Sequence, residues 1–201
     1  MNSLGRVDER DLDPDPLRQF ERWFEDAREG VAVPEAVALA TATTDGRPSA
    51  RMVLLKGSDG RGFSFYTNSE SRKARELAEN PRAALLFHWQ PLGRQVRVEG
   101  PVERVPDDEA AAYFRTRPLG SRLAAWASPQ SRLLADRAEL ERLYVEASAR
   151  HGDEPPLPPH WGGYRLVPDA YEFWEHGDDR LHDRVRYERD AVGWSRSRLA
   201  P

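Results

Sequence analysis

The stretch AVALATATTDGRPSARMVLLK, residues 36–56, contains two runs with strand character on either side of one turn pair. The first run, 36–44, is apolar and rich in threonine, and Asp45-Gly46 closes it. An Asp-Gly pair between two such runs strongly indicates a β-hairpin, because glycine readily adopts the positive φ that tight hairpin turns require. The second run, 47–56, is therefore predicted to return antiparallel to the first.

The rest of the chain combines further strands with helices. The other predicted strands are residues 62–67, 82–89 and 94–105, with three or four short ones within 161–199. The helices predicted from the spacing of apolar residues are 16–29, 70–79, 107–116 and 132–150. Strands in hairpin order with helices at the periphery favour a mostly β, α+β fold built on an antiparallel barrel.

One domain accounts for the length of 201 residues, which is enough to bury a sizeable core. Residues 1–14 are predicted to form a flexible arm, which leaves residues 15–201 as a single domain. Four prolines within 152–159 indicate a stiff extended crossing, because too little chain follows them to make a second domain.

Composition excludes several classes of function. The formal net charge is −4 and the chain has no basic face or tail, so nucleic acid is not an expected partner. The absence of cysteine removes disulfides and thiolate chemistry, and the five histidines lack the spacing of metal ligands. No apolar run approaches a membrane span, and the polar N-terminus is not a signal peptide. We therefore expect a cytoplasmic protein that binds no metal, membrane or nucleic acid.

Lysine is rare among the basic residues. Lys and Arg together number 30, yet only Lys56 and Lys73 are lysines. Lys73 follows Arg72 at the start of the predicted helix 70–79, where a cation opposes the helix dipole at a cost of about 0.3–1 kcal/mol. A bound anion, with phosphate the obvious candidate, would remove that cost. The alternative is a solvated helix start with two unfavourable charges.

Two strands carry polar residues that a ligand would explain. Residues 52–55 are apolar between Arg51 and Lys56, so this strand is predicted to lie in the core, where Arg51 needs an anionic partner. Further along, Gln95 lies on the strand face opposite to Val96 and is able to hydrogen-bond the edge of a heteroaromatic ring. A plain solvent-facing strand is the alternative for Gln95.

Two more groups have the chemistry of an anion site. Tyr113 and Arg117 are four residues apart on one helical face, and Ser121 follows after a turn. A phenol, a guanidinium and a hydroxyl can thus converge on one phosphate. Gln130 and Ser131, which open the next predicted helix, add a second pair of phosphate ligands.

The segment from Arg180 to Arg184 is the last group with this chemistry. If it is extended, Arg180, His182 and Arg184 share one face, and Leu181 and Asp183 share the other. Two cations and a histidine on one face repel one another unless they serve an electron-rich ligand. A charged edge strand that deters aggregation is the alternative.

In this order the motifs resemble those of the pyridoxamine/pyridoxine 5'-phosphate oxidase family, over nearly the whole chain. They are Arg-Met-Val-Leu-Leu-Lys (51–56), Phe-Tyr-Thr-Asn (65–68), Ser-Arg-Lys (71–73), Arg-Gln-Val (94–96), Arg-Pro-x-x-Ser (117–121), Ala-Trp-Ala-Ser-x-Gln-Ser (125–131), Trp-Gly-Gly-Tyr (161–164) and Arg-Leu-His-Asp-Arg (180–184). Family members often carry an Arg-x-x-Tyr element in the N-terminal arm. Here the arm has Arg6 and Arg10 but no tyrosine, so no residue of the arm is assigned.

The resemblance implies a split β-barrel homodimer with FMN bound at the subunit interface. The implied FMN contacts are Arg51, Met52, Val53, Leu54, Leu55, Lys56, Tyr66, Thr67, Arg72, Lys73, Gln95, Gln130 and Ser131, with Trp174 and Arg184 of the partner subunit. The implied substrate contacts are Lys56, Tyr113, Arg117, Ser121, Arg180, Leu181 and His182. Arg180 and His182 are also the implied catalytic pair, which holds the pyridine ring without acting as an obligatory base.

The implied reaction is the oxidation of pyridoxamine and pyridoxine 5'-phosphates to pyridoxal 5'-phosphate with O2 as acceptor (EC 1.4.3.5), in vitamin B6 biosynthesis or salvage. It releases hydrogen peroxide, and ammonia from the amine. One alternative is a related FMN oxidase acting on another aromatic compound, such as a phenazine precursor. Another is a non-catalytic protein that binds FMN or pyridoxal phosphate. Tyr113, Arg117 and Ser121 favour the phosphorylated vitamin, and the Arg180/His182 pair favours catalysis.

Overall fold

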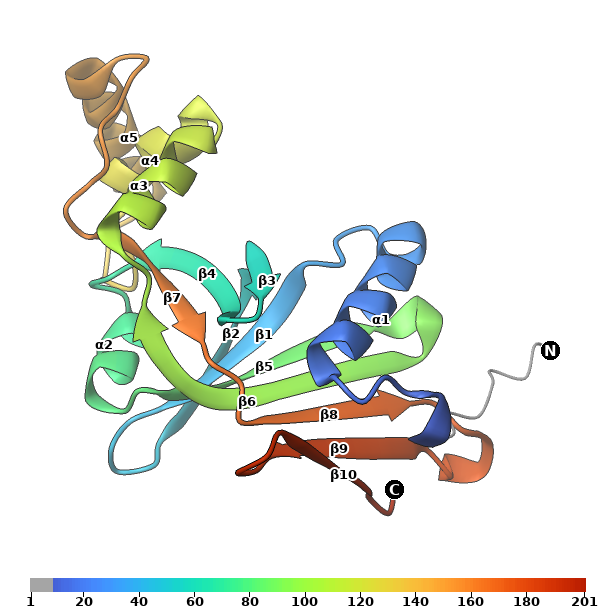
Figure 1. Ribbon diagram of the computed structural model, residues 1–201. Coiled ribbons are helices and arrows are strands. Elements are labelled where there is room, and N and C mark those ends of the chain that lie inside the picture. Colours follow the sequence, from blue (N-terminus) through green and yellow to red (C-terminus); the bar gives the residue numbers. More distant parts are fainter. Residues whose placement is uncertain (1–8) are drawn as a thin grey trace.

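The computed structural model describes residues 9–201, and its ten strands form one curled antiparallel sheet (Figure 1). The strands are β1 (Ala36–Ala42), β2 (Pro48–Leu54), β3 (Gly57–Asp59), β4 (Gly62–Asn68), β5 (Arg82–Trp89), β6 (Arg94–Arg104), β7 (Trp161–Leu166), β8 (Ala170–Glu175), β9 (Asp183–Arg189) and β10 (Trp194–Arg198). The α-helices are α1 (Pro16–Gly30), α2 (Arg72–Glu79), α3 (Asp107–Thr116), α4 (Leu119–Ala127) and α5 (Arg137–His151). The short 3-10 helices are η1 (Glu9–Asp11), η2 (Gln90–Leu92) and η3 (Asp178–Arg180).

The predicted hairpin is confirmed. Strands β1 and β2 pair antiparallel from Ala36 opposite Leu54 to Ala42 opposite Pro48. Gly46 in the connecting turn has a φ of 84°, the left-handed conformation for which glycine is suited. Strand β1 pairs on its other side with β5, so the hairpin forms one edge of the path β10-β9-β8-β6-β5-β1-β2.

Strand β6 turns the sheet over on itself. Residues Arg94–Glu99 pair with β8 and β5, whereas Val102–Arg104 pair with β7. Gly100 lies between these parts, and a Cβ there would lie 2.0 Å from the Val167 carbonyl oxygen, so only glycine permits this close approach. The change of partner joins β4 and β7 to the rest of the sheet and produces the curled half-barrel.

Helix α1 supplies the aromatic centre of the core. Asp15 caps it by accepting a hydrogen bond from the Leu17 N–H at 2.9 Å, as the sequence predicts. Phe20 is completely buried, and its ring centroid lies 4.8 Å from that of Phe63 on β4 and 5.0 Å from that of Phe87 on β5. One helix therefore holds both parts of the curled sheet together.

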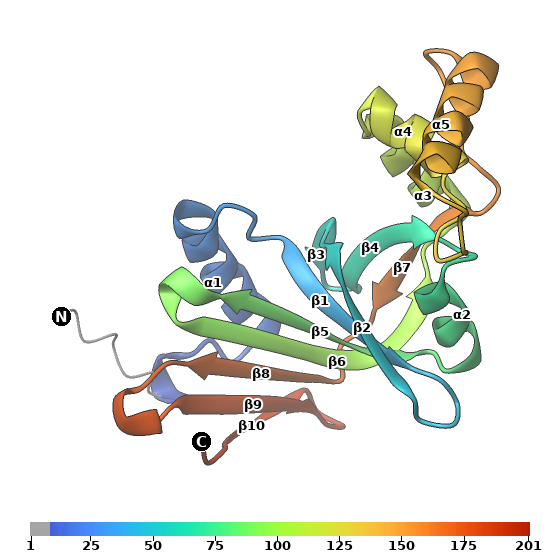
Figure 2. The ribbon, with the colours of Figure 1, turned by 180° about the vertical axis from the view of Figure 1, so that it is seen from behind.

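Helices α3, α4 and α5 form a lobe that projects from the end of the sheet where β4 and β7 lie (Figures 1 and 2). Arg165 of β7 is buried and ties α3 to the sheet through an ion pair with Glu109 at 2.7 Å. Phe114 of α3 packs edge-on against Trp161, with ring centroids 5.0 Å apart. These contacts fix the lobe beside β4 and β7.

Two features of the lobe differ from the sequence prediction. Helix α4 was not predicted, and Pro118, which precedes it, offers no side-chain cap. Helix α5 begins at Arg137 and not at residue 132, because Asp136 caps it by accepting a hydrogen bond from the Glu139 N–H at 2.8 Å. The residues predicted to open this helix, 130 and 131, therefore lie in the loop between α4 and α5.

The predicted flexible arm is only partly described, because residues 1–8, including Arg6, lie outside the described residues. Leu12 is buried, and its carbonyl oxygen accepts a hydrogen bond from Arg196 at 2.9 Å. The Asp13 carbonyl oxygen accepts one from the Tyr187 hydroxyl at 2.8 Å. Residues 12 and 13 thus contact β9 and β10, and the flexibility of the arm stays a prediction.

Strand β2 is an edge strand of the chain and not the core strand that its apolar sequence predicted. Met52 is 63% exposed and Leu54 is 44% exposed. Ala38 of β1 is paired with Met52 on one side and with Leu86 of β5, itself exposed, on the other. These residues form an apolar outer face, defined here as Ala38, Met52, Leu54 and Leu86.

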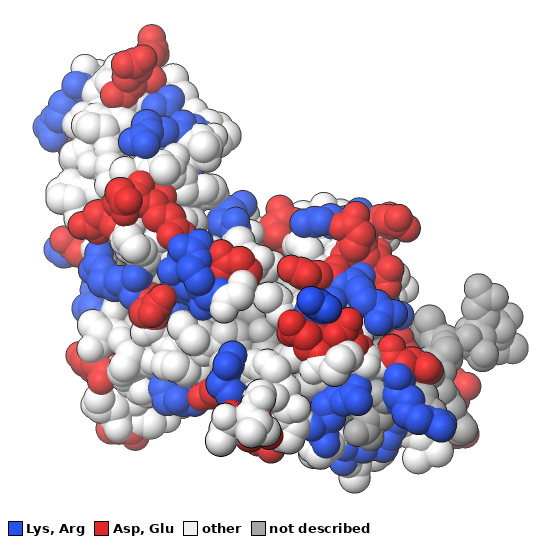
Figure 3. All heavy atoms as spheres, in the orientation of Figure 1, with Lys and Arg blue, Asp and Glu red and all other residues white. Residues whose placement is uncertain are grey.

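The surface otherwise carries charges of both signs. Acidic and basic side chains are interspersed over the face seen in Figure 3. Within residues 9–201, no helix has the length and apolar character needed to cross a membrane.

Candidate functional site

A cavity of about 450 Å³ lies between β2, β4, the start of α2 and the helical lobe. It brings together eleven of the predicted site residues: Met52, Val53, Leu54, Lys56, Tyr66, Thr67, Lys73, Tyr113, Arg117, Ser121 and Gln130. Its remaining lining residues are Thr116, Pro118 and Trp161, which the sequence did not single out. The structure thus gathers most of the residues predicted for the cofactor and for the substrate phosphate around one space.

Lys73 is the buried cation of this cavity. Its Nζ donates hydrogen bonds to Gln130 Oε1 at 2.9 Å, Thr67 Oγ1 at 3.1 Å and Ser71 Oγ at 3.4 Å. Burial, and to a smaller extent the charge of Arg51, lower the pKa of Lys73 to about 8, although the Glu76 carboxylate acts in the opposite direction. An ammonium bonded directly only to neutral oxygens attracts an anion, as predicted for the start of α2.

Arg51 has a different partner from the one expected. The sequence predicted that this arginine needs an anionic partner, which a second contact to a bound anion would supply. Glu76 of α2 supplies one, because its Oε2 lies 3.2 Å from Arg51 Nη2, and its Oε1 lies 2.8 Å from Nε of Arg72. Arg51, Arg72 and the neighbouring Leu55 do not line the cavity themselves.

An aromatic stack forms the wall of the cavity beside the lobe. The rings of Tyr66, Tyr113 and Trp161 contact one another, with centroid distances of 4.2 Å for Tyr66–Tyr113, 5.4 Å for Tyr66–Trp161 and 6.2 Å for Tyr113–Trp161. A Cβ at Gly163 would lie 2.7 Å from the Tyr66 ring, which explains the glycine next to this stack. The Trp-Gly-Gly-Tyr motif therefore could have indicated Trp161 as a cavity residue, although the sequence analysis used the motif only for the family resemblance.

Arg117 points its guanidinium into this wall, 5.0 Å from the ring centroid of Trp161. Burial lowers the pKa of Arg117, and its Nη1 is a buried donor with no partner among residues 9–201. Such orphaned donors are rare unless a ligand or water satisfies them. Lys56, Tyr113 and Ser121 line the same cavity, so the four residues predicted to bind the substrate phosphate share one space.

A second group of predicted site residues lies where β8 ends and β9 begins. Its members are Gln95, Trp174, Arg180, Leu181, His182 and Arg184. Gln95 of β6 is directly opposite Trp174 of β8, and Trp174 is directly opposite Arg184 of β9. The His182 ring lies 4.7 Å from that of Trp174, and its Nδ1 accepts a hydrogen bond from the Gly177 N–H at 3.2 Å. A neutral His182 therefore carries its proton on Nε2, which is left to donate to a ligand.

The segment from Arg180 to Arg184 is not extended throughout, which corrects the prediction of one shared face. Arg180 has a φ of 62° and ends η3, and β9 begins only at Asp183. Gly177 allows this tight turn, since a Cβ there would lie 2.1 Å from the Leu181 carbonyl oxygen. Arg180 therefore lies on an exposed turn that also exposes Leu181, and not on the strand that carries Arg184.

Strained backbone coincides with predicted function at two positions. Among residues 9–201, only Ser131, Asp179 and Arg180 combine a side chain with positive φ. This conformation is uncommon for residues other than glycine and persists where the surroundings impose it. Ser131 and Arg180 are both predicted site residues, and Asp179 precedes the second.

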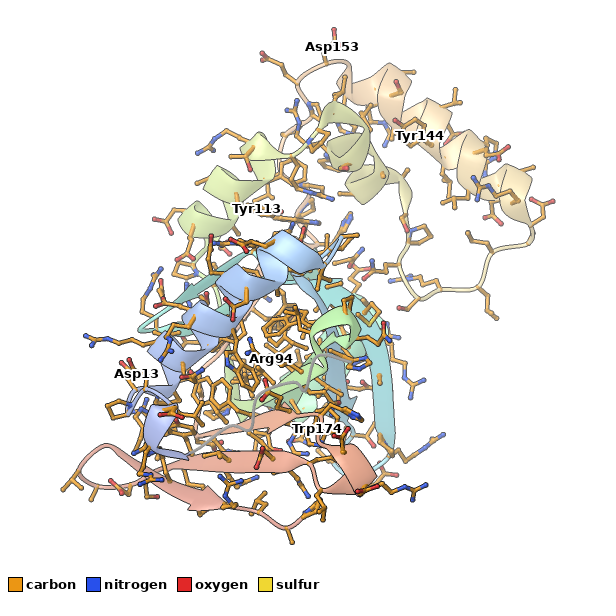
Figure 4. The ribbon with its side chains drawn as sticks, turned by 90° about the vertical axis from the view of Figure 1, so that its right-hand side faces the viewer. Asp13, Arg94, Tyr113, Tyr144, Asp153 and Trp174 are labelled. Atoms are coloured by element: carbon orange, nitrogen blue, oxygen red, sulfur yellow. The ribbon has the colours of Figure 1, made fainter. Side chains whose placement is uncertain are left out.

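The two groups do not meet within one chain. Figure 4 labels Tyr113 in the lobe and Trp174 near the opposite end of the sheet. None of Gln95, Ser131, Trp174, Arg180, Leu181, His182 and Arg184 lines the cavity. A site containing both groups therefore requires a second chain.

Comparison with known proteins identifies the family. Residues 24–150 match the family model for pyridoxamine 5'-phosphate oxidase, and residues 161–201 match that for the C-terminal dimerisation region of pyridoxine 5'-phosphate oxidase. This chain belongs to the pyridoxamine 5'-phosphate oxidase family. The family assignment, the split-barrel fold and the homodimer that the C-terminal region implies agree with the sequence predictions.

Individual members of the family are similar over the whole chain. The pyridoxine/pyridoxamine 5'-phosphate oxidase of Cupriavidus taiwanensis is 58% identical over 98% of this chain and 94% of its own length. That of Burkholderia vietnamiensis is 56% identical over 99% of this chain and 95% of its own.

Two crystal structures share the fold. PhzG from Burkholderia lata 383, in complex with tetrahydrophenazine-1-carboxylic acid, superposes with a TM-score of 0.92 at 37% identity over the whole of both chains. An FMN-binding protein related to pyridoxamine 5'-phosphate oxidase, from Nostoc punctiforme, superposes with a TM-score of 0.75 over 94% of this chain and all of its own. At 19% identity, the second likeness concerns the fold alone.

Enzymes of the family bind FMN, which confirms the predicted cofactor. The residues present fit this group. A phosphate would meet the buried Lys73 ammonium, and a planar ring system would meet apolar side chains of β2. The orphaned donor of Arg117 leaves room for a second anionic ligand in the same cavity.

Proposed function

We propose that this chain oxidises pyridoxamine 5'-phosphate and pyridoxine 5'-phosphate to pyridoxal 5'-phosphate, with FMN as cofactor and O2 as acceptor (EC 1.4.3.5). The products besides pyridoxal 5'-phosphate are hydrogen peroxide and, from the amine, ammonia. The observation that carries this proposal is the cavity in which an unpartnered Arg117 donor lies with Tyr113 and Ser121 next to the buried Lys73. This arrangement offers two anion sites in one space, as one phosphorylated cofactor and one phosphorylated substrate require.

The proposed roles follow the two groups of residues. Lys73, Thr67 and Gln130, with the residues of β2, would hold FMN, which supplies the acceptor for the hydride and returns electrons to O2. Lys56, Tyr113, Arg117 and Ser121 would bind the substrate phosphate, and thereby fix the distance of the pyridine ring from the flavin. Arg180 would clamp the ring, and His182 would donate a hydrogen bond from Nε2, with Leu181 beside them.

We further propose that FMN lies at the interface of the homodimer. Met52 and Leu54 belong both to the lining of the cavity and to the apolar outer face of β2, β1 and β5. A second chain on that face would cover exposed apolar surface and close the cavity. It would also supply Trp174, Arg184, Arg180 and His182, none of which lines the cavity of its own chain.

Residues 15–201 are proposed to act as one FMN-binding domain. The proposal is supported by β6, which pairs with strands from both the N-terminal and the C-terminal parts of the chain. A cytoplasmic location stays a prediction.

A related FMN oxidase acting on a non-phosphorylated aromatic compound is the second candidate. The likeness to PhzG over the whole chain favours it. The Tyr113, Arg117 and Ser121 set favours a phosphorylated substrate, and the relatives named as vitamin B6 oxidases are more similar in sequence. The vitamin B6 phosphates therefore remain the better proposal.

The proposal is tested with the purified full-length protein. We expect a yellow protein with flavin absorbance that forms hydrogen peroxide with both phosphorylated vitamers. With unphosphorylated pyridoxine the reaction should be at least about 100-fold less efficient, because the buried Arg117 donor then has no phosphate to bind. A flavin-containing protein that shows no preference for the phosphorylated vitamers would favour the second candidate. A flavin-containing protein without any oxidase activity would favour the non-catalytic binder.

The affinity for FMN is expected to fall as the pH rises through about 8. The pKa of Lys73 in the folded protein is lowered to about 8 from its ordinary 10.5, so its ammonium is lost in this range, and with it the attraction for the phosphate dianion. Once Lys73 is largely neutral, each further pH unit should raise the dissociation constant by up to about tenfold, until the residual affinity of the neutral lysine is reached.

Quenching of flavin fluorescence by the apoprotein, between about pH 6.5 and 9.5, measures this effect. Lys73→Met is the control, which should bind FMN weakly and with little change over this range. A dissociation constant for the unsubstituted protein that does not change with pH would contradict the assignment of Lys73 to the phosphate.

A further inference from the structure

Glu76 is a buried carboxylate whose hydrogen-bond partners lie on β1, on β2 and at the start of α2. It lies on the inward face of α2, three residues after Lys73, and is 4% exposed. Neither the family motifs nor the spacing of charges in the sequence drew attention to it. The structure shows that it bridges α2 and the β1–β2 hairpin.

Both oxygen atoms of Glu76 accept hydrogen bonds. Oε2 accepts hydrogen bonds from Thr41 Oγ1 at 2.5 Å, Ser49 Oγ at 2.6 Å and Arg51 Nη2 at 3.2 Å. Oε1 accepts from Arg72 Nε at 2.8 Å. Burial alone would raise the pKa of Glu76, but these hydrogen bonds outweigh it and lower the pKa to about 2, so the group is a carboxylate at neutral pH.

The carboxylate fixes the two arginines in different ways. Arg51 is held on several sides, since its Nη1 also donates to Thr41 Oγ1 at 2.5 Å and to the Leu39 carbonyl oxygen at 3.3 Å. Arg72 gives Glu76 only its Nε, and its side chain is 57% exposed. Both Nη groups of Arg72 therefore remain for a ligand at the start of α2.

Without a carboxylate, three cations would lie together. Arg51, Arg72 and Lys73 lie at one end of α2 and on the adjacent strand, and the charge of Arg51 already lowers the pKa of Lys73. Glu76 offsets part of this repulsion and at the same time fixes the direction of the Arg72 guanidinium. A planar guanidinium binds phosphate well only when its fork is correctly oriented.

We propose that Glu76 is a positioning residue for the FMN phosphate, which holds Arg51 and Arg72 in place so that the phosphate meets oriented cations beside Lys73. This inference rests on the proposed function, since it takes FMN as the ligand of the cavity. If Glu76 instead competed with the phosphate for the arginines, its removal would strengthen FMN binding.

The experiment compares FMN with riboflavin, which lacks the phosphate, as ligands of the apoprotein. Glu76→Gln keeps the size of the side chain and removes its charge, and Glu79→Gln removes an exposed charge from the same helix as a matched control. We expect Glu76→Gln to weaken FMN binding about 10- to 100-fold and riboflavin binding less than about twofold, because only FMN uses the charge-assisted bonds. Glu79→Gln should change neither constant by more than about twofold.

A second variant guards against a folding defect in Glu76→Gln. Ser49→Ala removes one donor to the same carboxylate oxygen and keeps every charge. It should weaken FMN binding by about two- to fivefold. As in Glu76→Gln, the loss of affinity should be larger for FMN than for riboflavin.

Three results would overturn the inference. The first is an equal loss of affinity for FMN and riboflavin in Glu76→Gln, which would indicate a purely structural role. The second is unchanged FMN binding in this variant, and the third is tighter FMN binding. If the unsubstituted apoprotein bound no FMN, the proposed function would fail together with this inference. If it bound FMN and Glu76→Gln bound it equally well, only the inference would fail.

Discussion

Arg180→Ala is expected to lower kcat about 100- to 1,000-fold while the FMN content of the protein stays unchanged, because the substitution removes one oriented cation from the reacting ring. The fold should tolerate the change. The Arg180 side chain is exposed on the turn that ends η3, and the next residue, Leu181, is 66% exposed. FMN content should be preserved because the proposed phosphate contacts, Lys73 and Gln130, line the cavity, whereas Arg180 does not.

The measurement pairs steady-state kinetics on pyridoxamine 5'-phosphate with the ratio of flavin to protein absorbance. Arg47→Ala is the matched control, since Arg47 is an exposed arginine in the β1–β2 turn. Arg180→Lys should give an intermediate loss, because an ammonium keeps the charge without the planar fork. Unchanged turnover in Arg180→Ala, or a parallel loss of flavin, would refute the assigned role.

Much of the fold was predictable because its signals are local. Asp45-Gly46 determines the first hairpin, and Asp15 determines the start of α1, and both act within a few residues. The alternation of Val96 and Val98 places both of them in the core, as observed. Local signals of this kind need no knowledge of the partner strands.

The errors arise where contacts distant in sequence decide the structure. The role of Glu76 could not be predicted from the sequence, because it depends on the packing of α2 against β1 and β2. The hydrogen bond between Arg51 and Glu76 joins residues 25 positions apart. The turn at Arg180 depends on the close approach of Gly177 to Leu181. The alternating charges of this segment gave no indication of that contact. The alternation of charged residues led to the prediction of an extended segment from Arg180 to Arg184, because a charged edge strand shows the same period of two.

The apolar run 52–55 was misread for a similar reason. An apolar strand in a sequence is compatible with burial in its own chain or against another chain, and periodicity does not distinguish them. In the structure Met52 and Leu54 face outward, although Leu55 beyond the end of the strand is buried. We therefore interpret the run as a surface that becomes buried in the homodimer, with the proposed FMN cavity at its border.

Met52→Glu is consequently expected to convert most of the dimer to monomer and to release most of the FMN. Burying an unpaired carboxylate in an apolar contact costs several kcal/mol, and a cost of about 4 kcal/mol corresponds to an about 1,000-fold weaker dimer. Flavin should be lost with the dimer, because the proposed site takes Trp174 and Arg184 from the second chain.

Sedimentation over a range of protein concentrations, together with the flavin content of each species, measures both effects of Met52→Glu. Val145→Glu is the control, because Val145 is 65% exposed on α5 and lies outside both the apolar outer face and the C-terminal dimerisation region. It introduces the same charge and should leave dimer and flavin intact. A Met52→Glu protein that stayed dimeric with its full complement of flavin would show that β2 does not contribute to the interface, and the cavity would then have to be completed by residues other than those of the β8–β9 group.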